Sequence, residues 1–335
     1  MLAAIDYYRK ALDLLKNLPQ YLETRLGLMS HLGRLLQQRG RLVEALDMYR
    51  MMHDSAELDG YLLGQARARN AQAAIYIVLD EQRAALTAAA EAEQLARLTG
   101  ADPELVRAQL LQGEAAGRLG DGVAAARVLE RVLEYERATV TPEATARALA
   151  LLAMFAPNPQ VVSRAFEALR ALAEELERDG NEDEAAYAIG QEGEALLSRG
   201  RPHEALDQFE RALARQRTAG NTRAAAELLQ LGGIAACRVG NPADAIRFLE
   251  EAESLAESTG YRYLRLGCRL AVGEALLALE RYAAAEATLR QVMAMADDRR
   301  RLGGWLHRRK AYELLASVLT QQGRADEARL LKGQA

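Results

Sequence analysis

The chain has 335 residues and a formal net charge of −4, with 50% hydrophobic and 27% charged residues. This balance excludes a disordered chain, and the interspersed charges give no electrostatic reason to expect binding to nucleic-acid phosphates or anionic lipid. No apolar run approaches the length of a membrane span and no signal-peptide pattern opens the chain, so a cytoplasmic protein without a membrane partner is expected.

An alanine recurs every 40 residues, each time between a turn and an apolar helical pattern. The series runs Ala45, Ala85, Ala125, Ala165, Ala205, Ala245 and Ala285. Five residues before these alanines the turn holds a glycine in most units, and Asp80 and Glu280 occupy the same place. No alternating strand pattern appears between the turns. The period therefore predicts pairs of helices, one pair in each block of about 40 residues.

In chain order, the period predicts one continuous array over 1–335 that opens with half a repeat at 1–20. The full repeats follow at 21–60, 61–100, 101–140, 141–180, 181–220, 221–260, 261–301 and 302–335. A native array rarely opens on half a hairpin. We therefore expect the chain to be a fragment of a larger protein, or to lie downstream of one.

Glycine also recurs inside the first helix of the repeats, at Gly33, Gly113, Gly193, Gly233 and Gly273. A glycine inside a helix costs about 1 kcal/mol relative to alanine, so this recurrence predicts close helix crossing. Helix starts are predicted at Asp102 and Thr141, each read as an N-cap that a proline follows.

The repeat at 141–180 is irregular because its inter-helix turn, residues 156–160, contains two prolines. Prolines forbid helix continuation through this point. The segment predicts either a hinge that divides 1–156 from 157–335, or a longer loop within one continuous array.

The pattern resembles the tetratricopeptide repeat (TPR), a two-helix unit with small residues at fixed positions and an aromatic residue in the second helix. The segments that carry the resemblance are AAIDYYRKAL, GRLVEALDMY, GRPHEALDQFERAL and GNPADAIRFLEEA. Tyr8, Tyr49 and Phe209 stand at the aromatic position, and leucine replaces the aromatic residue in several other units. The resemblance spans nearly the whole chain and implies an all-α fold, a right-handed superhelical solenoid.

The repeats are longer than the standard unit of about 34 residues. Long units of this kind resemble the C-terminal TPR region of STAND-type signalling ATPases, including those linked to LuxR-type transcription activators or adenylate cyclase domains. That resemblance implies a regulatory or sensor module.

First helices line the concave face of such arrays, so residues 40 apart in them form a ladder. Arginine recurs in this way, and related positions carry further polar side chains that could bind the carboxylates of an acidic peptide or a chain terminus. The predicted partner-binding residues are Arg34, Arg67, Asn70, Arg107, Arg118, Arg147 and Arg238. The alternative interpretation is that these arginines are solvated or pair with Glu114, Glu194 and Glu274.

One basic cluster, Arg299–Arg301 with His307–Lys310, flanks the single tryptophan, Trp305. It suggests nucleic-acid or partner docking, but the acidic residues before it and the lack of interleaved aromatics favour a solvated connector.

No catalytic residue, cofactor site or metal site is predicted. The four histidines form no metal-spaced pair, and the chain contains no phosphate-binding loop, dinucleotide fingerprint or nucleophile elbow. Cys237 and Cys268 are predicted to be buried thiols.

The sequence favours a non-catalytic protein–protein interaction scaffold, the TPR sensor or regulatory module of a larger bacterial signalling or transcription regulator. Alternatives are a free-standing adaptor that assembles a cytoplasmic complex, and a TPR receptor for a peptide or small molecule. The partner is expected to be a protein, a peptide or another domain of the same polypeptide. A homodimer is also considered, because the leading half repeat would leave an apolar face uncovered.

Overall fold

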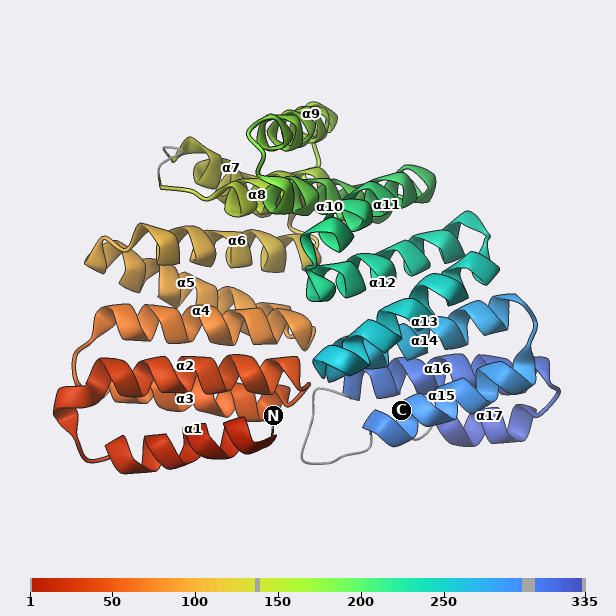
Figure 1. The fold of residues 1–335 in the computed structure, drawn as a ribbon, viewed down its shortest axis with the longest axis horizontal. Helices are drawn as coiled ribbons and strands as arrows, with labels where there is room; N and C mark the ends of the chain where they lie inside the picture. Colours follow the sequence, from red (N-terminus) through yellow and green to blue (C-terminus); the bar gives the residue numbers. More distant parts are fainter. Residues whose placement is uncertain (1, 136–138, 297–304, 333–335) are drawn as a thin grey trace. The chain divides into compact units, whose positions relative to one another are not determined.

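The computed structural model describes residues 2–135, 139–296 and 305–332, and all regular structure within these ranges is helical (Figure 1). The first helices of the pairs are α2 (Leu22–Gln38), α4 (Leu62–Val78), α6 (Asp102–Arg118), α8 (Pro142–Phe155), α10 (Glu182–Ser198), α12 (Thr222–Val239), α14 (Arg262–Ala278) and α16 (Trp305–Gln321). The second helices are α1 (Leu2–Leu15), α3 (Leu42–Leu58), α5 (Gln82–Thr99), α7 (Gly122–Glu134), α9 (Pro159–Arg178), α11 (Pro202–Ala219), α13 (Pro242–Thr259), α15 (Tyr282–Ala296) and α17 (Ala325–Lys332). A short 3-10 helix, η1 (Pro19–Tyr21), joins α1 to α2.

The helices form two compact units. The N-terminal unit comprises residues 1–37 and 41–172, and the C-terminal unit comprises residues 38–40 and 173–335. Successive helices pack on one another from α3 to α8 in the first unit and from α10 to α17 in the second. First helices also contact each other, as α4, α6 and α8 do in the N-terminal unit. This sequential packing is the α-solenoid of TPR-like repeats that the sequence predicts.

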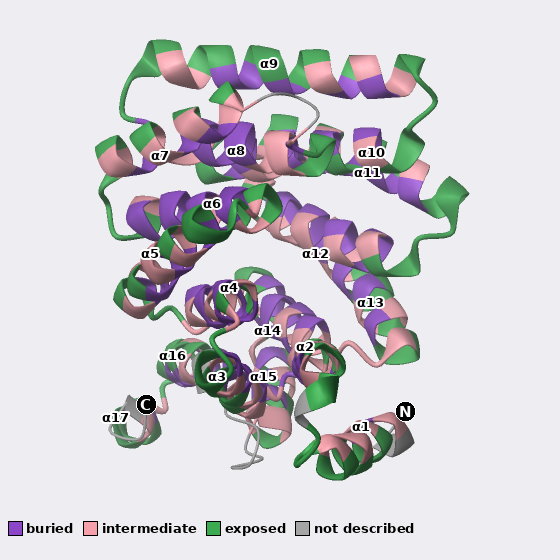
Figure 2. Ribbon diagram, turned by 90° about the vertical axis from the view of Figure 1, so that its left-hand side faces the viewer, coloured by how far each residue is buried: buried purple, intermediate pink, exposed green. Residues whose placement is uncertain are grey.

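The periodic alanines lie in the core of each hairpin. The side chains of Ala45, Ala85, Ala125, Ala165, Ala205, Ala245 and Ala285 are at most 3% exposed. Buried residues lie along one side of a helix and exposed residues along the other, as α9 illustrates (Figure 2). A larger side chain at the alanine position would force the paired helices apart.

The glycines inside the first helices allow close helix packing, which confirms the prediction. A Cβ atom at Gly113 would lie 2.6 Å from the Cγ and Cδ2 atoms of Leu129. A Cβ at Gly33 would lie 2.5 Å from the ring of Tyr49. The large residue of the second helix therefore fills the space that a methyl group would need.

The turn between the two helices of a pair needs a left-handed backbone. Glycine provides it in most units, but Asp80 and Glu280 adopt it with φ of 63° and 57°. Residues with a Cβ pay about 1–2 kcal/mol for this conformation. The turn geometry thus follows the repeat, even where the residue type does not.

The two predicted helix starts differ in outcome. The Thr141 hydroxyl accepts a hydrogen bond from the Ala144 amide at 3.3 Å, so Thr141 is an N-cap as predicted. The prediction for Asp102 was wrong by one residue, since Asp102 is the first residue of α6 and Ala101 is its N-cap. The Ala101 carbonyl accepts the first helical bond, from the Leu105 amide at 3.0 Å.

The irregular segment 156–160 separates α8, which ends at Phe155, from α9, which begins at Pro159. The prolines thus end the helix as expected. The Phe155 ring lies where a Cβ of Gly117 would lie, so the end of α8 packs closely on the end of α6. Whether this segment acts as a hinge stays a prediction.

Candidate functional site

A groove of about 410 Å³ opens on the first helices of the N-terminal unit. We call it the arginine groove, because three of the predicted partner-binding residues, Arg34, Arg67 and Arg107, line it. The remaining lining residues are Glu23, Leu26, Gly27, Ser30, His31, Tyr49, Met52, Tyr61, Gly64, Ala71 and Glu104. Helices α2, α4 and α6 therefore bring together side chains that lie far apart in the sequence.

Two of the guanidinium groups converge near the hydroxyl of Tyr49. Burial raises the pKa of Tyr49 to about 12, and the nearby positive charges of Arg107 and Arg34 oppose this rise. The hydroxyl donates a hydrogen bond to Oε1 of Gln37 at 3.2 Å. Tyr49 thus stays protonated at neutral pH and offers no negative charge to either arginine.

Neither Arg34 nor Arg107 has a carboxylate partner among the residues that the structure describes. The Arg34 guanidinium lies 2.8 Å from Nδ1 of His31. Arg107 is exposed and forms no hydrogen bond or ion pair with any described residue. This wall of the groove therefore carries two cations that no anion neutralises.

Arg67 and Asn70 serve a different purpose, because both contact Glu104 at the start of α6. Nε of Arg67 lies 3.3 Å from the Glu104 carboxylate. The Asn70 amide, which is fully buried, donates at 2.9 Å to the Glu104 backbone carbonyl and at 2.9 Å to its carboxylate. Asn70 therefore joins α4 to α6 beneath the groove, and Arg67 is partly neutralised.

Gly27 lies inside α2 on the wall of the arginine groove. A Cβ atom built on it would meet no atom within 4 Å, in contrast to the tightly packed Gly33 and Gly113. Gly27 stands thirteen residues before the left-handed turn residue Gly40, and Arg67 stands thirteen residues before Asp80. The same face of α2 thus carries open space where α4 carries an arginine.

Arg118 and Arg147 share one carboxylate, that of Glu114. Arg118 donates to it at 2.8 Å from the same helix, and Arg147 donates at 3.0 Å from α8. Burial raises the pKa of Glu114, and the positive charges and hydrogen bonds of Arg147 and Arg118 lower it. The lowering effect is the larger in sum, so the pKa lies below its ordinary value. The structure thus pairs these two predicted residues with a glutamate that the alternative interpretation named.

Arg238 lies in the C-terminal unit, where it donates to the Leu197 carbonyl at 3.0 Å. It lines a second groove of about 540 Å³, which we call the C-terminal groove. Residues of α12, α14 and α16 form this groove: Gln230, Ile234, Arg238, Tyr263, Gly267, Leu270, Ala271, Glu274, His307, Lys310, Glu313, Leu314 and Ser317. The structure therefore gathers Arg34, Arg67 and Arg107 in one groove, and places Arg238 in another.

Sequence reasoning missed three contributors to the arginine groove: His31, Tyr49 and Gly27. Their proximity depends on how α2, α3 and α6 pack, which the repeat period alone does not specify. The place of Gly27 in the groove could have been predicted from the sequence. Gly27 occupies the same position in its repeat as Arg67 and Arg107, and this position differs from that of the tightly packed glycines.

The other candidate groups are a possible metal-binding set, the two cysteines and the basic cluster. One set of side chains in the described residues, His53, Asp54 and Glu57, could approach a metal ion, and its two acids are exposed on a single helix. The thiols of Cys237 and Cys268 are free, and burial raises their pKa values to about 11 and about 12. Residues 299–301 of the basic cluster lie outside the described residues. No helix in the described ranges is long and apolar enough to cross a membrane.

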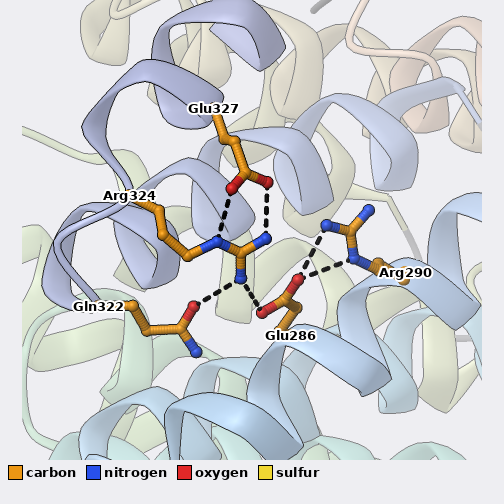
Figure 3. Close-up of polar contacts among 5 residues, drawn as sticks. All are labelled: Glu286, Arg290, Gln322, Arg324 and Glu327. Atoms are coloured by element: carbon orange, nitrogen blue, oxygen red, sulfur yellow. Dashed lines mark hydrogen bonds and ion pairs between the residues drawn. The ribbon is translucent and has the colours of Figure 1, made fainter.

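A network of charges ties the last helix to the array (Figure 3). Arg324 binds both carboxylate oxygens of Glu327 at 2.7 and 2.6 Å, and binds Glu286 of α15 at 2.7 Å. Arg290 donates to the same Glu286 carboxylate at 2.8 Å. The hydrogen bonds that Arg324 donates to Glu327 and Glu286 raise the pKa of Arg324. Arg324 thus links Glu327 of α17 to Glu286 of α15, and none of these residues lines either groove.

Comparison with known proteins gives structural matches alone, since no family model and no curated protein sequence matches the chain. A STAND protein with a tetratricopeptide repeat sensor from Pyrococcus horikoshii is 14% identical over 99% of this chain, with a TM-score of 0.50. The chain spans 52% of that protein.

Two other solved structures are similar over most of their length. The apo form of the quorum sensor NprR from B. thuringiensis has a TM-score of 0.56 at 14% identity, over 98% of this chain and 81% of NprR. A Rap protein complexed with Competence and Sporulation Factor has a TM-score of 0.50 at 15% identity, over 97% of this chain and 86% of the Rap protein. At such identities the likeness concerns the fold. Together with the helix order and the periodic alanines, it shows that the chain is a TPR-like repeat protein.

Proposed function

We propose that the chain is a non-catalytic binding module whose arginine groove holds the carboxylates of an acidic peptide segment or a protein C-terminus. The observation that carries the proposal is Arg107, an exposed guanidinium in the groove that forms no ion pair with any described residue, next to Arg34, whose described partner is the imidazole of His31. An arginine without a carboxylate partner can bind a carboxylate of a ligand with two hydrogen bonds.

The surroundings of these two arginines suit a carboxylate. Tyr49 and His31 beside them are polar but carry no negative charge. The groove also contains two carboxylates, those of Glu104, which pairs with Arg67, and of Glu23, so its three arginines outnumber its acids. Each guanidinium group can bind one carboxylate with two parallel hydrogen bonds. The chain as a whole carries a net charge of −4, so an acidic ligand has no general attraction to it and must find a local cationic site.

The setting that we propose is a regulatory or sensor module of a larger bacterial signalling ATPase or transcription regulator. Support comes from the 40-residue repeat and from the similar fold of the STAND protein with a TPR sensor. A phosphate-binding loop encoded upstream of Met1 in the same reading frame would support this setting. A stop codon directly upstream would instead favour a free-standing adaptor.

A peptide or small-molecule receptor is the second candidate. The similar fold of NprR, a quorum sensor, and of the Rap protein in complex with Competence and Sporulation Factor favours it. The two candidates share the same groove. They differ in whether the ligand is free or belongs to another protein, which affinity capture from a lysate separates from a screen with free peptides.

The direct test is fluorescence anisotropy with a labelled pentaglutamate peptide. We expect Arg34→Gln and Arg107→Gln each to weaken binding by about tenfold, since a hydrogen bond to a charged group contributes about 1.5–3 kcal/mol. Arg127→Gln removes an exposed arginine from α7, outside the groove, and is the matched control. Equal affinity of all three variants and the wild type would contradict the proposal, and so would binding that ignores added salt.

A further inference from the structure

Helix α1 exposes a face that the other second helices bury. The periodic alanine Ala45 of α3 is 0% exposed, whereas the equivalent Ala4 of α1 is partly exposed. Tyr49 of α3 is 1% exposed, whereas Tyr8, at the same aromatic position of α1, is partly exposed. Helix α3 follows a first helix, α2, that covers this face, and α1 follows no first helix in the described chain.

Two large apolar side chains also lie on the uncovered side of α1. Tyr7 is 70% exposed and Leu14 is 78% exposed, three and ten residues after the periodic alanine. The same two positions of α5 hold Ala88 and Leu95, and both pack against core clusters to which α4, the first helix of that hairpin, contributes. Tyr7 and Leu14 are therefore placed to contact a covering helix. We call the surface formed by Ala4, Tyr7, Tyr8, Ala11 and Leu14 the open face of α1.

The completed hairpins show what a helix on this face must carry. A Cβ on Gly33 of α2 would lie 2.5 Å from the ring of Tyr49, and a Cβ on Gly193 of α10 would lie 2.6 Å from the ring of Phe209. Each glycine lies sixteen residues before its aromatic partner. A second helix with an aromatic residue at this position therefore packs on a helix with glycine opposite the ring, and Tyr8 imposes the same requirement.

The tyrosine hydroxyl adds a second requirement. The Tyr49 hydroxyl donates a hydrogen bond at 3.2 Å to Oε1 of Gln37, which lies four residues after Gly33 and thus on the same side of α2. Phe209 has no hydroxyl, and the corresponding position of α10 holds Leu197. A helix that suits Tyr8 therefore combines a glycine with an amide four residues later.

A second copy of this chain has no such helix to offer. Helix α1 itself contains no glycine, so two α1 helices cannot pack on each other in the way that α2 packs on α3. The first helices that contain the glycine already cover their own second helices, as Gly33 does at Tyr49 and Gly233 does at Leu249. The occupant of the open face is therefore a helix from outside residues 1–335 of this chain.

We propose that the open face of α1 binds an amphipathic helix of a partner protein, which takes the place of a first helix and completes the hairpin. Its apolar stripe contacts Tyr7 and Leu14, its glycine lies opposite the Tyr8 ring, and its amide accepts a hydrogen bond from the Tyr8 hydroxyl. None of the residues of the open face lines the arginine groove, so this interaction does not depend on the function proposed above.

The test is fluorescence anisotropy of the full chain with a labelled peptide of residues 22–38, the sequence of α2, which carries both the glycine and the amide. We expect saturable binding. In the peptide, Gly33→Ala should weaken binding about tenfold, because the new Cβ would meet the Tyr8 ring as it would meet Tyr49 in the intact hairpin. Gly27→Ala is the matched control, since it gains the same helix propensity and its Cβ would meet no atom within 4 Å. This peptide should bind at least as tightly as the parent.

In the protein, Leu14→Gln should weaken binding of the parent peptide about tenfold through lost apolar contact. Thermal unfolding should stay unchanged, because Leu14 is 78% exposed. Leu330→Gln, which changes a leucine that is 72% exposed on α17, is the matched control and should bind like the wild type.

Three results would overturn the proposal: no saturable binding of the parent peptide, equal affinity of the parent and Gly33→Ala peptides, or full affinity of the Leu14→Gln protein. Light scattering covers the remaining alternative. A dimer of the wild type that Leu14→Gln dissociates would show that a second copy covers the open face, and would overturn the proposal as well.

Discussion

Replacing Gly27 with alanine is expected to make the protein more stable and its arginine groove less able to bind. Alanine in a helix interior is favoured over glycine by about 1 kcal/mol. No steric penalty offsets this gain, because the new Cβ would meet no atom within 4 Å. The methyl group would instead project into the groove that Arg34 and Arg107 line. Stability and affinity should therefore change in opposite directions.

Thermal and urea unfolding, followed by circular dichroism, measure the first effect, and anisotropy with labelled pentaglutamate measures the second. We expect a rise of about 1 kcal/mol in unfolding free energy and a several-fold loss of affinity. Gly232→Ala is the control: it lies inside α12, its Cβ would make ordinary contacts at 3.9 Å, and it lines neither groove. A less stable Gly27→Ala protein, or one with unchanged affinity, would refute the reasoning.

Three further predictions concern stability. Gly113→Ala should destabilise the N-terminal unit by about 1–3 kcal/mol in urea unfolding, because its Cβ would lie 2.6 Å from Leu129. Glu280→Gly should stabilise the C-terminal unit by about 1 kcal/mol, since φ there is 57°; no gain would contradict the backbone argument. Glu114→Gln should cost about 1–3 kcal/mol at neutral pH. The folded-state pKa of Glu114 is lowered, so its contribution is present above the ordinary value of 4.5 and lost as pH falls through the folded value; the wild type and variant should converge in acid.

The sequence was informative wherever a feature repeats at fixed spacing along the chain. The alanine at 45 and its equivalents, the tightly packed glycines and the left-handed turns at Asp80 and Glu280 all follow from local geometry that most repeats share, with 141–180 as the exception in its turn. These features determine which helices pair, so the fold could be predicted from the period.

The candidate site was less predictable. The repeat period makes all first helices equivalent, but the site depends on the individual side chains by which they differ. Arg107 and Arg147 are 40 residues apart and equivalent in phase, yet one is free of any described partner and the other binds Glu114. The difference arises from a single carboxylate on α6. Asp102 illustrates the same limit at a helix end, where a one-residue shift moves the cap to Ala101.

The position thirteen residues before each left-handed turn is open to almost any side chain. For the left-handed turns inside a helix pair, this position holds Gly27, Arg67, Arg107, Tyr187, Glu227, Gly267 and Lys310, while the residue five positions after the turn is always alanine. Different positions of the same repeat therefore determine what the surface can bind and how the helices pack. Exchanging whole repeats, or only the residue at this position, is therefore a way to change the ligand specificity of the protein while keeping its fold.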